Sequence, residues 1–145
     1  MKALIQRVRK AQVNVEGKTV GQIDQGILAL IGIEKTDTYD NAQRLLKKIY
    51  SYRIFSDDED KMNLSLQDIN GGLLLVSQFT LVANTQKGLR PSFSSAANPQ
   101  MSEELYDYLV KQAKQTNLNI QTGQFAANMQ INLINDGPVT FNLQC

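Results

Sequence analysis

Polar residues that could do chemistry follow directly after an apolar segment in the middle of the chain. The segment 73–76 is aliphatic, and Ser77, Gln78, Phe79 and Thr80 come next. Ligand sites commonly lie where a buried strand ends, and a serine or threonine hydroxyl there could attack an ester. Such hydroxyls are also often structural, and no G-x-S-x-G sequence surrounds Ser77. Both interpretations stay open on these residues alone.

A second candidate site lies near the carboxyl end, in Asn135-Asp136-Gly137-Pro138. The segments 127–134 and 139–144 on either side are apolar at alternate positions, which predicts two strands with one buried face each. Asp-Gly between them predicts a hairpin, although Pro138 has no amide proton to donate. The turn could be a stiff connection, or a cis Gly137–Pro138 bond could direct carbonyl oxygens at a ligand.

The composition excludes several kinds of catalysis. The chain has no histidine, which removes Ser-His-Asp and Cys-His nucleophiles, histidine bases and the usual zinc sites. Its single cysteine, Cys145, can form neither an internal disulfide nor a thiolate cluster. The acidic segment 57–60 lacks the spacing of an EF-hand loop. We therefore expect no bound metal and no cofactor.

Cations that could bind an RNA backbone occur in two clusters. Arg44, Lys47 and Lys48 share one face of a predicted helix, and Lys87 and Arg90 lie in a loop with a glycine and a proline. The net charge of +1 provides no general attraction for nucleic acid, so binding would rest on such clusters. A solvated helix face is the simpler interpretation of the first cluster, and the loop does not have the P-loop pattern.

The segments around these residues predict a mixture of strands and helices. Alternating residues from 3 to 15, a turn at 16–17 and a return through 20–23 predict a strand and hairpin. The apolar segment 26–33 predicts a strand buried on both faces. A helix is expected after Asp37 as its N-cap, and a second one opens at Asn98-Pro99. Arg7, within the first strand, is either a solvated charge or a buried guanidinium that holds a carbonyl group.

Length and patterning predict one domain, residues 1–145, of the α/β (α+β) class. No apolar segment approaches the roughly 20 residues that cross a bilayer, and the amino-terminal residues do not resemble a signal peptide. We expect a cytoplasmic protein that does not bind membranes.

Three segments together resemble the D-aminoacyl-tRNA deacylase family. They are Ser77-Gln78-Phe79-Thr80-Leu81, Lys87-Gly88-Leu89-Arg90-Pro91-Ser92-Phe93 and Asn135-Asp136-Gly137-Pro138-Val139-Thr140. The resemblance covers essentially the whole chain and includes Gln6-Arg7-Val8 and Tyr52-Arg53-Ile54-Phe55. One departure is Ala126-Ala127, where many members have Gly-Ala. If that glycine has a positive φ, the local backbone is expected to differ here.

The resemblance implies a mainly antiparallel, barrel-like sheet with two principal helices. It also implies a homodimer with active sites at the subunit interface, and proofreading by hydrolysis of D-aminoacyl-tRNA to free amino acid and tRNA. Glycyl-tRNA is an expected further substrate. The missing histidine agrees with this family, whose members are thought to use main-chain groups and the ribose 2′-hydroxyl of the substrate.

Residue roles follow from the same resemblance. Main-chain amides near Phe79 and Thr80 would polarise the ester carbonyl, and Ser77 and Gln78 would orient the substrate. Gly137 and Pro138 would bind the substrate ammonium group and exclude L side chains.

Supporting roles fall to residues near those two motifs. Arg7, Val139 and Thr140 would support the Gly-Pro motif, and Lys87 and Arg90 would contact tRNA.

Two other functions stay open from the residues. One is an esterase in which Ser77 or Thr80 is the nucleophile, with a lysine or carboxylate as base. The other is a non-catalytic RNA-binding module that uses the two cation clusters.

Overall fold

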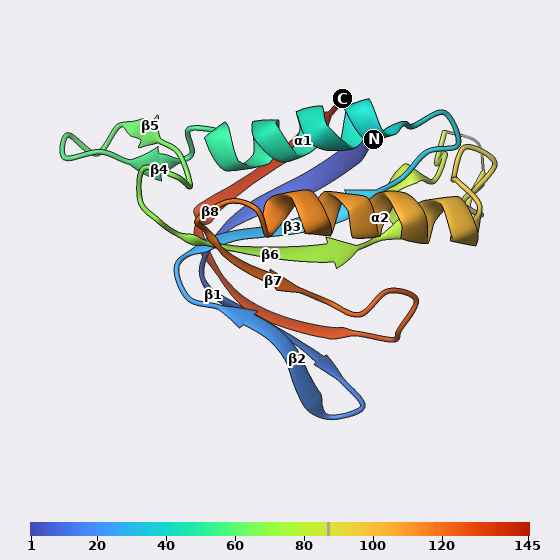
Figure 1. Cartoon of the computed structure of the whole chain (residues 1–145), viewed down its shortest axis with the longest axis horizontal. Coiled ribbons are helices and arrows are strands. Elements are labelled where there is room, and N and C mark those ends of the chain that lie inside the picture. The colour runs from blue at the N-terminus through green and yellow to red at the C-terminus, as the bar shows by residue number, and fades with distance from the viewer. Residues whose placement is uncertain (87) are drawn as a thin grey trace.

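The computed structural model describes residues 1–86 and 88–145, so Lys87, a predicted tRNA contact, lies outside the described residues. Figure 1 shows strands with two long helices packed on them. The strands are β1 (Lys2–Val15), β2 (Lys18–Ile23), β3 (Gly26–Gly32), β4 (Phe55–Ser56), β5 (Met62–Leu64), β6 (Gly72–Ser77), β7 (Asn119–Thr122) and β8 (Gln130–Gln144). The helices are α1 (Tyr39–Ser51), the short 3-10 helix η1 (Phe79–Val82) and α2 (Pro99–Ala113).

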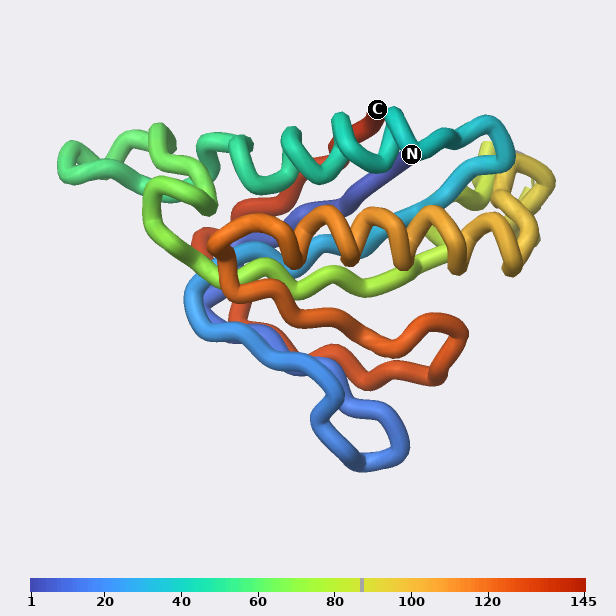
Figure 2. Tube along the Cα trace, in the orientation of Figure 1, coloured from blue at the N-terminus to red at the C-terminus, as the bar shows by residue number. Residues whose placement is uncertain are grey.

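The long strand β1 organises the main sheet. Its first half pairs antiparallel with β3 and its second half with β2, while β8 runs antiparallel along its other edge. The strands β6 and β7 then join β3 as parallel neighbours. The sheet curls, and β2 approaches β7 so closely that a Cβ at Gly21 would collide with the Thr122 carbonyl oxygen. The curl can be followed in Figure 2, and it confirms the predicted barrel-like sheet with two principal helices.

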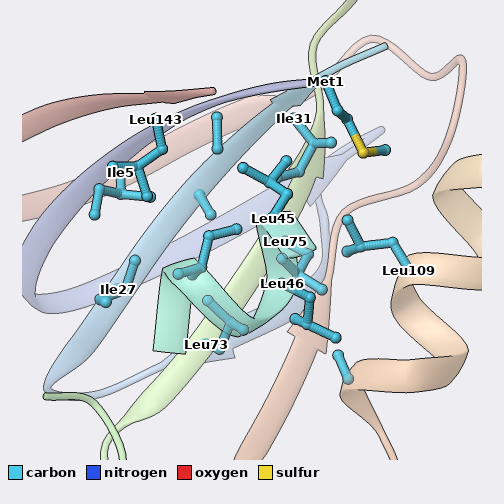
Figure 3. Packing of buried hydrophobic residues seen from close by; sticks show 14 of the residues in the cluster. Met1, Ile5, Ile27, Ile31, Leu45, Leu46, Leu73, Leu75, Leu109 and Leu143 are labelled. Carbon is cyan, nitrogen blue, oxygen red and sulfur yellow. The ribbon is translucent and has the colours of Figure 1, made fainter. Parts of the chain in front are cut away.

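Apolar residues on both faces of the sheet fix its central strands. The helices α1 and α2 cover one face, where leucines of both helices meet the strands (Figure 3). The labelled members of this core are Met1, Ile5, Ile27, Ile31, Leu45, Leu46, Leu73, Leu75, Leu109 and Leu143. A second cluster fills the inside of the curl and includes Leu28, Leu74 and Val76. The strands β3 and β6 are thus buried on both faces, as predicted for 26–33.

The two long helices begin with side-chain caps. Asn98 caps α2, with Pro99 in its first turn, as predicted. The predicted cap of α1 is wrong by one residue, because Thr38 makes the capping box with Asn41. Asp37 is buried and instead contacts the Met1 ammonium group, which also donates to the Cys145 carbonyl oxygen at 2.7 Å. The two ends of the chain therefore lie side by side (Figure 2).

The predicted carboxyl-terminal hairpin is wrong. The segments on both sides of the Gly-Pro turn are strands, but they form one strand, β8, along the length of β1. Gln6 pairs with Thr140 and Val8 with Asn135, so the residues Asp136–Val139 stand opposite Arg7 alone. We call Asp136–Val139 the β8 bulge. Such a bulge interrupts the ladder and frees backbone groups for other contacts.

Local hydrogen bonds explain the acidic segment after α1. The predicted loop at 57–60 joins the short strands β4 and β5. Asp57 Oδ1 accepts hydrogen bonds from the Glu59 and Lys61 amides at 2.9 and 3.0 Å. These bonds, the largest from Lys61, lower the pKa of Asp57 below its ordinary value. The carboxylate therefore closes a turn.

The strands β4, β5 and β7 were not predicted, because each is too short to show an apolar period. Among the described residues, no helix is long and apolar enough to span a bilayer.

Candidate functional site

A pocket of about 550 Å³ opens at the carboxyl end of β6. Ser77, Gln78 and Phe79 line one side of it. The remaining walls come from the ends of β3 and β6, the region around the start of α2, the segment after β7 and the start of β8, with the residues Ile31, Ile33, Val76, Ala97, Pro99, Ser102, Phe125, Ala126, Ala127, Met129 and Ile131. Thr80 is exposed and does not line the pocket, although its hydroxyl accepts a hydrogen bond from Gln78 Nε2. The pocket therefore unites three of the four residues predicted for catalysis.

The backbone changes from strand to helix inside this site. The Gln78 amide still extends the ladder and donates to the Ile31 carbonyl oxygen at 2.7 Å. The chain then enters η1, in which the Leu81 amide donates to the Gln78 carbonyl oxygen at 3.2 Å. The first amides of a helical turn lack acceptors within that turn. Those of Phe79 and Thr80 can therefore donate to an oxygen of a ligand.

The pocket contains no obvious acid or base. None of its lining side chains that the structure describes is Asp, Glu, Lys, Arg, Tyr or Cys, and the chain has no histidine. No described residue forms a hydrogen bond with the Ser77 hydroxyl, so no base is positioned to activate it. This arrangement can polarise a carbonyl group through the backbone, but it disfavours a serine nucleophile with a neighbouring base.

The segment that follows β7 supplies a further wall of the pocket. Phe125 packs against the ring of Tyr106 from α2, with centroids 5.9 Å apart. The Tyr106 hydroxyl donates to the Leu75 carbonyl oxygen at 2.9 Å, and burial raises the pKa of Tyr106 above its ordinary value. The hydroxyl therefore stays protonated as a donor that ties α2 to β6 behind the pocket.

Ala126, one of the two residues that depart from the family pattern, has a left-handed backbone conformation. Its φ is +57°, the left-handed conformation that glycine adopts most easily. The alanine thus takes a positive φ itself, so this departure from the family pattern does not prevent a left-handed residue at position 126. Sequence reasoning missed Phe125, Met129 and Ile131 as lining residues, because nothing in their local pattern separates a pocket wall from a core.

Arg7 holds the β8 bulge by its carbonyl groups. Its Nε donates to the Asp136 carbonyl oxygen at 3.0 Å, and Nη1 donates to the Ile54 carbonyl oxygen at 2.7 Å. Its side chain is only 13% exposed. Of the two interpretations from sequence, the structure therefore has the guanidinium that fixes carbonyl groups.

The side chains of Arg7 and Arg9 both form ion pairs with Asp136 in the same bulge. Its carboxylate oxygens lie 3.4 Å from Arg7 Nε and 3.2 Å from Arg9 Nε. Gly137 has a φ of +126°, and the Gly137–Pro138 peptide bond is cis, as predicted. Val139 is buried, and its amide donates to Asn135 Oδ1 at 3.3 Å. Thr140 is exposed and resumes the pairing with β1.

Within one chain the pocket and the β8 bulge are separate. Arg7 pairs with Ile27 at the start of β3, whereas Ser77 pairs with Ile31. Four residues of strand separate these positions by about 13 Å. Gly137 and Pro138 are exposed and do not line the pocket.

The predicted cation clusters have different surroundings. Arg44 pairs with Asp40 at 3.0 Å on α1, and Lys48 Nζ donates to the Gln144 carbonyl oxygen at 3.3 Å. Arg90 is exposed in the loop that follows η1. The helix cluster thus has contacts of its own within the chain, and contact of Arg90 with tRNA stays a prediction.

Comparisons with known proteins agree on one family. The family model described as D-Tyr-tRNA(Tyr) deacylase matches residues 4–144. A D-aminoacyl-tRNA deacylase of Pseudoalteromonas translucida (strain TAC 125) is 61% identical over 143 residues, 99% of each chain. One of Proteus mirabilis (strain HI4320) is 60% identical over 144 residues, also 99% of each.

Solved structures match over the same length. The structure titled c-Myc DNA Unwinding Element Binding Protein has a TM-score of 0.95 and 36% identity, over 100% of this chain and 99% of that one. A probable eukaryotic D-amino acid tRNA deacylase, at 16% identity and a TM-score of 0.81 over 98% of both chains, shares the fold. The chain belongs to the D-Tyr-tRNA(Tyr) deacylase family.

Proposed function

We propose that this protein hydrolyses the ester bond of D-aminoacyl-tRNA and releases free amino acid and tRNA. The observation that carries the proposal is the pocket at Ser77-Gln78-Phe79, which offers backbone donors and no titratable side chain. An aminoacyl ester is already activated and carries a ribose hydroxyl beside the reacting carbonyl group. It is a substrate that a site of this kind can cleave without a base from the protein.

Backbone amides supply the main electrostatic assistance in this mechanism. The amides of Phe79 and Thr80 donate to the ester carbonyl oxygen as negative charge develops on it. Because η1 fixes both amides in advance, no reorganisation is needed, and one such donor typically contributes about 3 kcal/mol. Ser77 and Gln78 orient the ester, and the 2′-hydroxyl of the substrate relays the proton.

The apolar part of the pocket accepts the terminal adenosine. Its volume of about 550 Å³ lies within the range of roughly 300–1,000 Å³ that is usual for small-molecule sites. Phe125 and Met129 offer flat or polarisable surfaces to a base, and Tyr106 supports Phe125 from behind. The nucleoside then directs its 3′ ester towards Ser77 and Phe79.

A homodimer completes the site. Gly137 and Pro138 are exposed, and they are held by Arg7 at a place that does not line the pocket of their own chain. In a two-fold dimer the same surfaces meet twice, so the bulge of each copy enters the pocket of the other. There the carbonyl oxygens of Gly137 and Pro138 bind the substrate ammonium group, and the bulge occupies the space of an L side chain. Glycyl-tRNA has no side chain to exclude and is hydrolysed as well.

Hydrolysis of matched D- and L-aminoacyl-tRNAs by the purified protein tests the activity. We expect rapid release of the D-amino acid and little release of the L-amino acid. Each 1.4 kcal/mol of unfavourable contact gives about a tenfold preference. Equal rates on the two esters, or hydrolysis of neither, would contradict the proposal.

Complementation between two variants tests the shared site. Ala127→Trp fills the pocket and Gly137→Val distorts the bulge, so each variant alone is expected to be inactive. Random mixing of coexpressed chains makes half of the dimers mixed, and each mixed dimer has one intact site. About a quarter of the wild-type activity should return. If none returns, the site lies within one chain.

A further inference from the structure

An exposed aromatic pair extends from the pocket wall to the protein surface. Phe79 lines the pocket and is 62% exposed, and Phe93, which does not line it, is 39% exposed. The two ring centroids lie 5.1 Å apart at an interplanar angle of 48°. Exposed phenylalanine rings next to a binding pocket offer flat apolar surface to a ligand larger than the pocket itself.

Hydrogen bonds on both sides of Phe93 hold the backbone at this residue. Asn84 and Ser92 exchange backbone hydrogen bonds of 2.7 and 3.0 Å, and the Ala96 amide donates to the Phe93 carbonyl oxygen at 3.0 Å. The Ser95 hydroxyl also donates to the Val82 carbonyl oxygen at 2.7 Å. The aromatic pair is therefore presented in a fixed position, which reduces the entropic cost of binding a ligand there.

The charge of the segments that carry the pair and the pocket wall favours an anionic ligand. The chain has 14 Asp and Glu residues, yet none of them falls within residues 69–102, where Lys87 and Arg90 are the only charged side chains. The segment 115–135, which supplies another pocket wall, has no charged side chain at all. Arg90 is exposed and forms no ion pair with the described residues. A phosphate group can approach this face without meeting a carboxylate of these segments.

We propose that the Phe79–Phe93 pair stacks the base of the nucleotide that directly precedes the aminoacylated adenosine. We also propose that Arg90 attracts the phosphate that joins these two nucleotides. This inference rests on the proposed function, because it takes the single-stranded 3′ end of tRNA as the ligand. Stacking of one base on aromatic side chains contributes about 1–3 kcal/mol and tolerates any base identity. The pocket then binds the adenosine, and the aromatic pair binds the nucleotide next to it.

Two short substrates isolate this contribution. The D-alanyl ester of adenosine lacks the extra nucleotide, whereas the D-alanyl ester of cytidylyl-adenosine carries it. For the wild type we expect kcat/KM to rise about five- to 150-fold with the added nucleotide. Phe93→Ala should lose at least fivefold of that gain, and Phe93→Trp, which keeps a stacking surface, should restore it.

Two controls separate stacking from other effects. Tyr39→Ala removes an exposed ring that pairs with Tyr108 between the two helices, at a centroid distance of 4.6 Å, and should keep the full gain. A substrate with an abasic ribose in place of the cytidine should show only the part of the gain that comes from the phosphate.

A second readout keeps the inference separate from the proposed function. The corresponding 3′-amide analogues cannot be hydrolysed in the same way, so their dissociation constants report the added nucleotide without turnover. An equal gain in wild type and Phe93→Ala, in both rate and affinity, would overturn the inference while hydrolysis of the D-ester upheld the function. Conversion of Phe93→Ala to a monomer in sedimentation would overturn it in favour of a surface that binds a second copy.

Discussion

Different contacts fix the backbone at the pocket and at the β8 bulge. The pocket lies where β6 leaves a doubly buried sheet, and its described lining has no titratable side chain. The bulge sets four residues against Arg7 alone, and Arg7 and Arg9 converge on Asp136. The sheet can fix the backbone of the pocket by packing and by hydrogen bonds between strands. The bulge lacks these hydrogen bonds, and those from the Arg7 guanidinium group take their place.

The difference suggests a division of tasks. On the proposed function, the uncharged pocket would provide hydrolysis, and the charge-held bulge would provide selection between D and L substrates. Mild changes in the bulge should therefore alter mainly selectivity and stability, whereas changes in the pocket, or a severe distortion of the bulge such as Gly137→Val, should also lower the rate.

Arg7→Met should have the largest effect. It removes the donors to the Asp136 and Ile54 carbonyl oxygens and leaves both groups without their partner. We expect a loss of about 3 kcal/mol in the free energy of unfolding, measured by urea titration. The ratio of D-ester to L-ester hydrolysis should fall by more than about tenfold. Arg7→Lys is the matched control, since it keeps the positive charge but lacks the planar set of donors of the guanidinium group. If Arg7→Met leaves the ratio of D-ester to L-ester hydrolysis unchanged, the bulge does not select between the two substrates.

Gly137→Ala should have the next largest effect. A side chain at φ +126° is strained, and its Cβ would lie 2.7 Å from Val139 Cγ2. We expect a cost of about 1–3 kcal/mol and a smaller D/L ratio. Gly17→Ala is the matched control, because Gly17 also has a positive φ but has open space around its Cβ position. It should lower stability and leave the D/L ratio intact. An equal loss of selectivity in both variants would point to a general loss of stability.

Ser77→Ala should slow hydrolysis only modestly. One neutral hydrogen bond contributes about 0.5–1.5 kcal/mol, which corresponds to a two- to thirteenfold change in rate. Single-turnover rates on D-alanyl-tRNA measure the change. A substrate that ends in 2′-deoxyadenosine should lose more with the wild type than Ser77→Ala loses with the natural substrate. Abolished activity in Ser77→Ala with normal cleavage of the deoxy substrate would establish a serine nucleophile.

Ala126→Gly should have the smallest effect, and it should stabilise. Glycine removes the cost of a left-handed alanine, about 1–2 kcal/mol, but is itself about 0.5–1 kcal/mol less favourable through its freedom in the unfolded chain. We expect a net gain of up to about 1.5 kcal/mol in the free energy of unfolding, measured by thermal or urea denaturation. A destabilised variant would show that the Ala126 methyl group makes a contact that outweighs its strain.

Patterns that repeat along the chain could be predicted from sequence. The doubly buried strands β3 and β6, the first hairpin and both long helices follow from apolar periods and capping residues. The β8 bulge could not be predicted as a bulge, because Asp-Gly between two alternating segments is equally a turn. Only the length of β1, which pairs with both segments, decides between them.

Part of the candidate site could likewise be predicted from sequence, and part could not. Ser77 and Gln78 stand out as polar groups at a strand end, and the family resemblance rather than a physical argument connected them and Phe79 with a reaction. Phe125 and Met129 line the pocket from a segment far along the chain. No local pattern predicts that contact, because it depends on β7 being parallel to β6. The partners of Arg7 likewise lie 47 and 129 residues away in sequence.

The division between pocket and bulge is tested most directly with three esters on one tRNA body. The D-alanyl, L-alanyl and glycyl esters differ only in the side chain that the bulge is expected to exclude. If selection works by exclusion, glycyl-tRNA is hydrolysed at a rate close to that of the D-alanyl ester and far above that of the L-alanyl ester. If glycyl-tRNA is instead as resistant as the L-alanyl ester, the protein recognises a D side chain by contact, and the exclusion account is wrong.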